Sequence, residues 1–135
     1  MLRGQGAIYC VRPDDTVFDA LRLMAEKNIG AVVVLEDQRI AGILSERDYA
    51  RKVILVGKTS KATLVSEIMT TKVIYVVPDW TAEQCMALMT EKQIRHLPVV
   101  EEGRLIGVVS IGDAVRAVVE DQQFTIRSLE RYITS

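Results

Sequence analysis

The chain has 135 residues, of which 49% are hydrophobic and 26% charged, as in an ordinary folded domain. Its 17 Lys and Arg residues balance 18 Asp and Glu residues, which excludes the basic excess of a general nucleic-acid binder. No apolar run approaches the roughly 18 residues of a membrane-spanning helix, and the N-terminus lacks the apolar core of a signal peptide. We therefore expect a cytoplasmic protein without a nucleic-acid or membrane partner.

The first half of the chain predicts a β-α-β-β-α series. Ile8–Val11 is a short run of strand-forming residues that Pro13 ends. Thr16 follows as the expected N-cap of a helix, with Asp19 three residues later as its capping-box partner. The face of this helix that we expect to be buried is marked by Val17, Ala20, Leu21 and Met24. The remaining predicted elements are a buried strand at Ala31–Leu35, a further strand at Ile40–Leu44 and a helix that begins near Ser45.

The second half predicts the same series again. A polar connection, Gly57–Ala62, and a short predicted helix, Leu64–Met69, lead into it. Its predicted elements are a strand at Val73–Val77, a helix capped by Thr81 and Gln84, strands at His96–Val100 and Leu105–Val109, and a helix that begins near Ser110. The buried face of the capped helix is predicted from the spacing of Ala82, Cys85, Met86 and Met89.

The two series are copies of one unit. When the sequence is shifted by 65 residues, Ile8–Arg51 aligns with Val73–Arg116 without a gap and with 16 identities in 44 positions. Similarity that keeps its register over a whole supersecondary unit indicates a duplication. One copy of about 50 residues is too small to bury its sheet face alone, so we expect a mixed α/β (α+β) fold in which the two copies pack together.

The repeat divides the chain into four predicted segments. They are a first repeat at residues 6–56, a linker with a short helix at 57–69, a second repeat at 70–120 and an amphipathic C-terminal helix at 121–135. One face of the last helix is predicted to carry Phe124, Ser128, Leu129, Tyr132 and Ile133. This face either closes the core or meets another subunit, and the sequence leaves both interpretations open.

Cysteine and histidine are too scarce for several kinds of chemistry. Cys10 and Cys85 lie far apart in apolar surroundings, and we expect both to be small core residues. A structural zinc site needs four ligands, and His96 is the one histidine, so we expect no metal. A nucleophilic Cys–His pair has the residue types that it needs but gains no support from the residues around either cysteine.

Two segments, Gly42–Asp48 and Gly107–Asp113, carry a glycine in a strand and then Ser and Asp at the start of a helix. As caps, Ser45 and Ser110 would bind the helix N-terminus, and the following carboxylate would lie at the positive end of the dipole. As a binding site, such a carboxylate can accept hydrogen bonds from the two hydroxyls of a ribose, and nearby N–H groups suit phosphate. Both interpretations remain open, because a duplication preserves a cap as well as a site.

Basic residues near these segments favour an anionic ligand. The stretch from Arg47 to Lys61 contains five Lys or Arg residues and one acid, Asp48. In the second copy, Arg95 and His96 open a strand whose other residues are apolar. A charged pair at such a position needs a partner, which an anionic ligand would provide. A solvated helix face and a strand end that reaches water are the alternatives.

The gap-free repeat, the element order and the two Gly-x-x-Ser-x-x-Asp segments resemble a tandem pair of cystathionine β-synthase (CBS) domains, a Bateman module, over about residues 6–120. The resemblance implies a pseudo-two-fold module with two clefts that bind an adenosyl ligand. NAD(H) or AMP is the expected ligand, with ATP, ADP and S-adenosylmethionine as others that the family binds. The resemblance also implies a regulatory role toward an effector protein and pairing into homodimers.

Carried over by position, the resemblance assigns residues to both clefts. In the first cleft the ribose would meet Asp113 beside Ser110, and the phosphates would meet Arg95 and His96. The walls around its adenine would be Ile8, Tyr9, Ile29, Gly30 and Val108. The second cleft would use Ser45 and Asp48 for ribose, Arg47, Arg51 and Lys72 for phosphates, and Ile43, Val73, Ile74 and Ile94 as apolar walls. Because Arg47 stands where the second copy has Gly112, we expect the two clefts to differ in ligand or affinity.

Three functions remain to be separated. The expected one is a nucleotide-sensing module, not itself an enzyme, whose ligand changes its interaction with an effector on another chain. A nucleotide-processing enzyme would need a base, a nucleophile or a metal in the cleft, and His96 is the one obvious base. A structural scaffold would bind no nucleotide, and Asp48 and Asp113 would then serve only as caps.

Overall fold

The computed structural model describes residues 8–134, with the side chains of residues 124–126 and 128–134 outside the described part. The chain divides near residue 74 into two compact units, residues 8–74 and 75–134, which are taken here in turn. We call them the first-repeat unit and the second-repeat unit. Both consist of a small sheet with helices, and the element order confirms the predicted mixed α+β fold.

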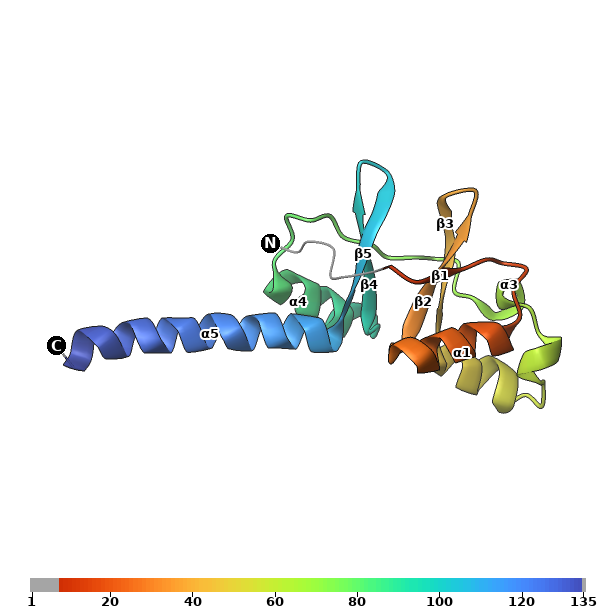
Figure 1. Ribbon diagram of the computed structural model, residues 1–135, viewed down its shortest axis with the longest axis horizontal. Helices are drawn as coiled ribbons and strands as arrows, with labels where there is room; N and C mark the ends of the chain where they lie inside the picture. Colours follow the sequence, from red (N-terminus) through yellow and green to blue (C-terminus); the bar gives the residue numbers. More distant parts are fainter. Residues whose placement is uncertain (1–7, 135) are drawn as a thin grey trace. The chain divides into compact units, whose positions relative to one another are not determined.

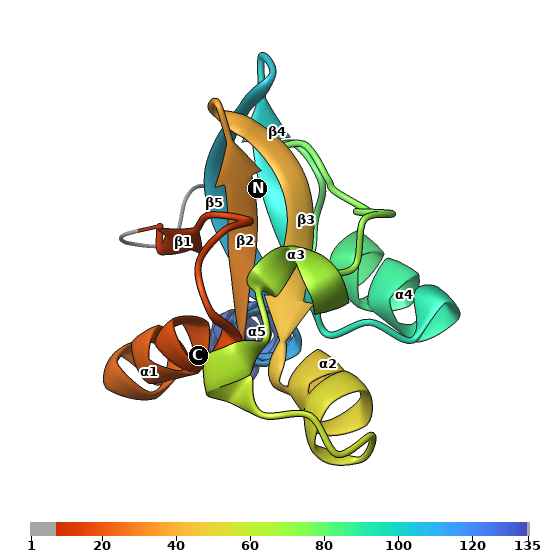
Figure 2. The same ribbon diagram turned by 90° about the vertical axis from the view of Figure 1, so that its right-hand side faces the viewer.

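The first-repeat unit is built on a three-stranded sheet in the order β1-β2-β3 (Figure 1). Its elements are β1 (Cys10–Val11), α1 (Val17–Lys27), β2 (Ala31–Glu36), β3 (Arg39–Ser45), α2 (Glu46–Tyr49), a π-helical turn (Ala50–Ile54), a 3-10 turn (Ser60–Ala62) and α3 (Val65–Ile68). Strand β1 pairs parallel with β2, which pairs antiparallel with β3. On the far side of β3, Ile43 exchanges two backbone hydrogen bonds with Thr70, at 2.9 and 3.0 Å. Figure 2 shows α1 and α2 below the β2–β3 hairpin and α3 in front of β3.

Local chemistry sets the limits of α1. The side chain of Thr16 accepts a hydrogen bond from the Asp19 N–H at 3.2 Å, which confirms the predicted cap. The reciprocal half of the capping box is not formed, and the Asp19 carboxylate instead pairs with Arg22 at 3.5 Å. The helix ends where Asn28 adopts a left-handed conformation with φ 54°. Its buried residues are Val17, Ala20 and Met24, three of the four that the spacing predicts, whereas Leu21 is half-buried.

The second-repeat unit repeats the hairpin and its two helices. Its elements are α4 (Ala82–Lys92), β4 (His96–Glu101), β5 (Arg104–Ser110) and α5 (Ile111–Thr134). The predicted Thr81–Gln84 capping box is complete, with both hydrogen bonds present at 2.9 and 3.1 Å. Helix α5 packs on α4 and then continues well beyond it (Figure 1).

Helix α5 has no break at residue 121, so the proposed boundary of a separate C-terminal helix falls inside a continuous helix. The face predicted at Phe124, Ser128, Leu129, Tyr132 and Ile133 lies outside the described side chains.

The strand predicted at Val73–Val77 is wrong in its extent. Only Val76 pairs, through a parallel bridge to Val99, whereas its counterpart β1 has two paired residues. Val76 donates to the Pro98 carbonyl at 3.0 Å and accepts from Val100 at 2.9 Å. Extending this parallel ladder back to Ile74 would need an N–H on residue 98, and proline has none. The predicted strand Ile8–Val11 is likewise shorter, because pairing begins at Cys10.

The two cysteines differ in burial. Cys85, on α4, is buried in the core as predicted. Cys10, on β1, is only half-buried, so its prediction as a core residue is only partly correct. Burial raises the pKa of both thiols, because desolvation disfavours the thiolate. Both cysteines are therefore less reactive at neutral pH than an exposed cysteine.

Candidate functional site

Both Ser-x-x-Asp segments form caps in the structure. The Asp48 N–H donates to Ser45 Oγ at 3.1 Å, and the Ser45 N–H donates to Asp48 Oδ2 at 3.0 Å. Ser110 and Asp113 make the same two bonds, at 2.9 and 3.1 Å. In both repeats the cap uses Oδ2 of the aspartate. A ligand would therefore donate its hydrogen bonds to the other carboxylate oxygen, Oδ1.

In the first repeat, Asp48 Oδ1 already has two donors. Thr70 Oγ1 lies 3.3 Å from it and Lys52 Nζ 3.2 Å from it. Ser45 Oγ adds a second contact to Oδ2, at 3.1 Å. The Asp48 side chain is 15% exposed. Its carboxylate therefore lies inside a polar cluster, which we call the Asp48 cluster: Ser45, Asp48, Lys52 and Thr70.

In the second repeat, Asp113 is more open. Its Oδ1 accepts a hydrogen bond from Arg116 Nη2 at 2.6 Å, and the side chain is 31% exposed. Arg116 is 69% exposed, so it lies in water and its ion pair is easily exchanged. Among the described residues, the Asp113 carboxylate contacts two hydrogen-bond donors, whereas the Asp48 carboxylate contacts four.

The β4–β5 register brings the basic pair of the second repeat to the start of α5. His96 lies directly opposite Ser110 in the antiparallel ladder, and Ile111 donates to the Arg95 carbonyl at 2.8 Å. Cross-strand partners present their side chains on the same face of a sheet. The register thus places the His96 side chain on the same face as that of Ser110, whereas Arg95 is joined to the start of α5 through its backbone carbonyl.

The remaining residues predicted for the first cleft lie in the other unit, apart from Val108 on β5. Ile8 and Tyr9 precede β1, and Ile29 and Gly30 lie between α1 and β2. The ring of Tyr9 has Lys27 Nζ 5.1 Å from its centroid, so one face of the ring already contacts a cation. These apolar residues belong to a different unit from Asp113. That they line the same cleft as Asp113 therefore stays a prediction.

Most residues predicted for the second cleft belong to the first-repeat unit. Those in this unit are Ile43, Ser45, Arg47, Asp48, Arg51, Lys72, Val73 and Ile74, whereas Ile94 belongs to the second-repeat unit. The phosphate candidates Arg47, Arg51 and Lys72 are all exposed, as a contact with an anion in solution requires.

Sequence reasoning did not assign a role to Lys52, Thr70 or Arg116. The spacing of Asp48 and Lys52, four residues apart on a helix, was a usable signal for an ion pair. Thr70 gave no such signal, because it lies 22 residues from Asp48 in the chain.

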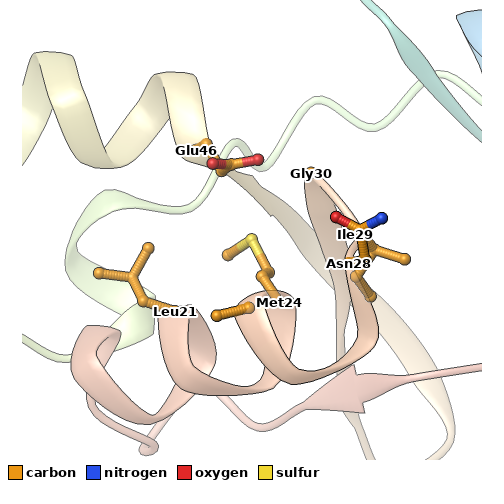
Figure 3. A pocket seen from close by; sticks show the side chains of 7 residues that line it. Leu21, Met24, Asn28, Ile29, Gly30 and Glu46 are labelled. Atoms are coloured by element: carbon orange, nitrogen blue, oxygen red, sulfur yellow. The ribbon is translucent and has the colours of Figure 1, made fainter.

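A cavity of about 220 Å³ lies between the end of α1 and the start of α2. It is lined by Leu21, Met24, Ala25, Asn28, Ile29, Gly30 and Glu46 (Figure 3). Ligand pockets usually measure about 300 to 1,000 Å³, so this cavity is small for a nucleotide, and neither Ser45 nor Asp48 lines it. It is therefore not the ribose site.

The described residues contain neither a group of metal ligands nor a membrane-spanning helix. In that part of the chain, no three His, Cys, Asp or Glu side chains are grouped to hold a metal ion. None of the helices described there is both long and apolar enough to cross a bilayer.

Comparisons with known proteins agree with this architecture. A family model described as the CBS domain matches residues 6–55 and again residues 65–120. The mitochondrial CBS domain-containing protein CBSX3 of Arabidopsis thaliana is 48% identical over 125 residues, which are 89% of this chain and 61% of that protein. The chain thus spans less than two thirds of this relative.

Solved structures of CBS-domain proteins are similar to this chain in three dimensions as well. A CBS-domain protein from Burkholderia ambifaria is 59% identical, with a TM-score of 0.83 over 89% of this chain and 88% of the other. CBSX2, solved in complex with AMP, is 28% identical, with a TM-score of 0.72 over 90% of this chain and 94% of its own.

Proposed function

Because the chain belongs to the CBS-domain family and carries two such domains in tandem, we propose that it is a regulatory module that binds an adenosine-containing nucleotide and thereby changes its interaction with an effector protein. The observation that carries this proposal is the Asp113 carboxylate. It lies at the start of a long helix, its Oδ1 accepts a hydrogen bond from the exposed Arg116, and the backbone of the basic pair Arg95–His96 adjoins the same helix start.

The chemistry of these groups suits a nucleotide. A carboxylate accepts hydrogen bonds from the two hydroxyls of a ribose, and a guanidinium binds phosphate oxygens in a bidentate manner. The AMP in the CBSX2 structure supports a nucleotide of this class. We propose AMP or NAD(H) as the ligand of the first cleft, with ATP or ADP as alternatives and no metal required. The two clefts, and the division into a first repeat at 6–56, a linker at 57–69 and a second repeat from residue 70, are parts of the same proposal.

The module is proposed to act as a homodimer in the cytoplasm. One relative is named as mitochondrial, so the compartment is a part of the proposal that fractionation of the native cell tests directly.

A panel of ligands tests the proposal. Ligand-stripped protein is melted with AMP, ADP, ATP, NAD⁺, NADH and S-adenosylmethionine, and free adenine serves as the control. A ligand at 100 times its Kd adds about 2.7 kcal/mol to the free energy of unfolding, which raises Tm by several degrees. A selective shift supports sensing and identifies the ligand class. No shift from any of the six favours the scaffold, and loss of ligand with time favours an enzyme.

Replacing Arg95 and His96 together by alanine separates phosphate from adenosine recognition. We expect AMP to bind roughly 10-fold more weakly or worse, because a charge-assisted contact is worth about 1.5–3 kcal/mol. Adenosine has no phosphate, so its affinity should change far less. Titration calorimetry with both ligands measures the difference, and Lys92→Ala at the exposed end of α4 is the matched control. Equal losses for the two ligands would contradict a phosphate role.

A further inference from the structure

The Asp48 cluster contains a lysine ion pair, whereas the carboxylate of the second repeat pairs with an arginine. Lys52 Nζ lies 3.2 Å from Asp48 Oδ1 and also donates to the Ile68 carbonyl at 2.9 Å. The lysine therefore ties the carboxylate at the start of α2 to the end of α3. Both contacts are partly buried, and the Lys52 side chain keeps 45% of its surface exposed.

The four donors around Asp48 match what a carboxylate can accept. Its two oxygens offer about four lone-pair sites, and the donors are the Ser45 N–H, Ser45 Oγ, Thr70 Oγ1 and Lys52 Nζ. A ribose hydroxyl can therefore bind only after one of them leaves. The Ser45 N–H is part of the backbone cap and is held in place by the helix start.

Of the side-chain donors, Lys52 is the one that can withdraw completely into water. Its ammonium is carried on a flexible four-carbon stem, and nearly half of the side chain already reaches water. An ion pair of this exposure contributes little to the free energy of unfolding, so a ligand can displace it at a modest cost.

Only the first repeat has a lysine at the position that forms this ion pair. The residue equivalent to Lys52 is Ala117, which cannot form an ion pair. In the second repeat the cation on the carboxylate is Arg116, three residues after Asp113 and largely in water. The helix after Asp48 contains a π-helical turn over Ala50–Ile54, whereas α5 is an uninterrupted α-helix.

We propose that Lys52 sets the affinity of the first-repeat site by competing with the ribose of a nucleotide for Asp48. A ligand enters this site by displacing the Lys52 ammonium, which also releases the Ile68 carbonyl at the end of α3. The two sites then fill in order, Asp113 first and Asp48 at higher nucleotide concentration. This inference rests on the proposed function of the two carboxylates as ribose acceptors.

The test uses adenosine, which has a ribose and no phosphate. In full-length protein that carries Asp113→Ala, adding Lys52→Met is expected to raise adenosine affinity by about 5-fold, the equivalent of one exposed ion pair. A further Asp48→Ala should abolish this gain. Lys52→Gln keeps a donor for the Ile68 carbonyl without the charge, so its agreement with Lys52→Met shows that the gain does not come from misfolding.

Lys58→Met is the matched control, because Lys58 is an exposed lysine of the same unit that forms no ion pair among the described residues. It should leave adenosine binding unchanged. Unaltered adenosine affinity in both Lys52 variants would overturn the inference. Weaker AMP binding with unchanged adenosine binding would also overturn it, since Lys52 would then be a phosphate ligand. The wild-type titration reports separately on the proposed function, which fails if neither AMP nor any other nucleotide of the panel binds to it.

Discussion

Replacing Asp113 by alanine is expected to weaken AMP binding by about 10- to 100-fold. Hydrogen bonds to a charged group contribute about 1.5–3 kcal/mol, and the ribose would lose both of its bonds to the carboxylate. The fold should survive, because loss of an acid at a helix start costs about 1 kcal/mol. Titration calorimetry gives the affinity, and a thermal melt gives the stability of the same sample.

Two further variants separate ligand binding from capping. Asp113→Asn keeps an oxygen for the Ser110 N–H, so it should preserve the cap and still lose affinity through the lost charge. Asp79→Ala removes an exposed carboxylate elsewhere in the second-repeat unit and should bind AMP like the wild type. If Asp113→Ala and Asp48→Ala both bind AMP with wild-type affinity, the two segments are caps and nothing more.

Replacing Gly42 by alanine is expected to lower the free energy of unfolding by about 2–3 kcal/mol. A Cβ at this position would lie 2.8 Å from Met69 Sδ and 2.8 Å from the Thr70 carbonyl oxygen. The methionine can move, but the carbonyl is held by its hydrogen bond from the Ile43 N–H at 3.0 Å. The segment must therefore shift away from β3, and Tm should fall by on the order of 10 °C.

Gly112→Ala is the internal control for this experiment. Its nearest neighbour would be Ser110 Oγ at 3.7 Å, an ordinary contact, and the residue lies in the first turn of α5. Alanine in a helix is favoured over glycine by about 0.5–1 kcal/mol, so this variant should be as stable as the wild type or more so. Equal melting temperatures for Gly42→Ala and the wild type would show that the Thr70 segment is not held against β3 as described.

The sequence correctly predicts contacts between residues that are close together in the chain. The Thr16 and Thr81 caps and the Ser–Asp pairs depend on contacts three residues apart, which backbone geometry at a helix start brings together. The hairpins are predicted equally well, because runs of apolar residues flank a polar turn in both copies. The strand at Val73–Val77 fails for a reason outside the run itself, namely the missing N–H of Pro98 in the neighbouring strand.

The sequence by itself determined the duplication, the element order, the helix caps and the choice of Asp48 and Asp113 as candidate ribose acceptors. The tertiary structure decided how accessible each carboxylate is. Lys52 reaches a carbonyl 16 residues away, and Thr70 reaches Asp48 across 22 residues because Gly42 lets that segment approach β3. Such contacts depend on where the chain returns after the linker. No periodicity within either repeat encodes that return, so two motifs that share the same Gly, Ser and Asp positions have different surroundings.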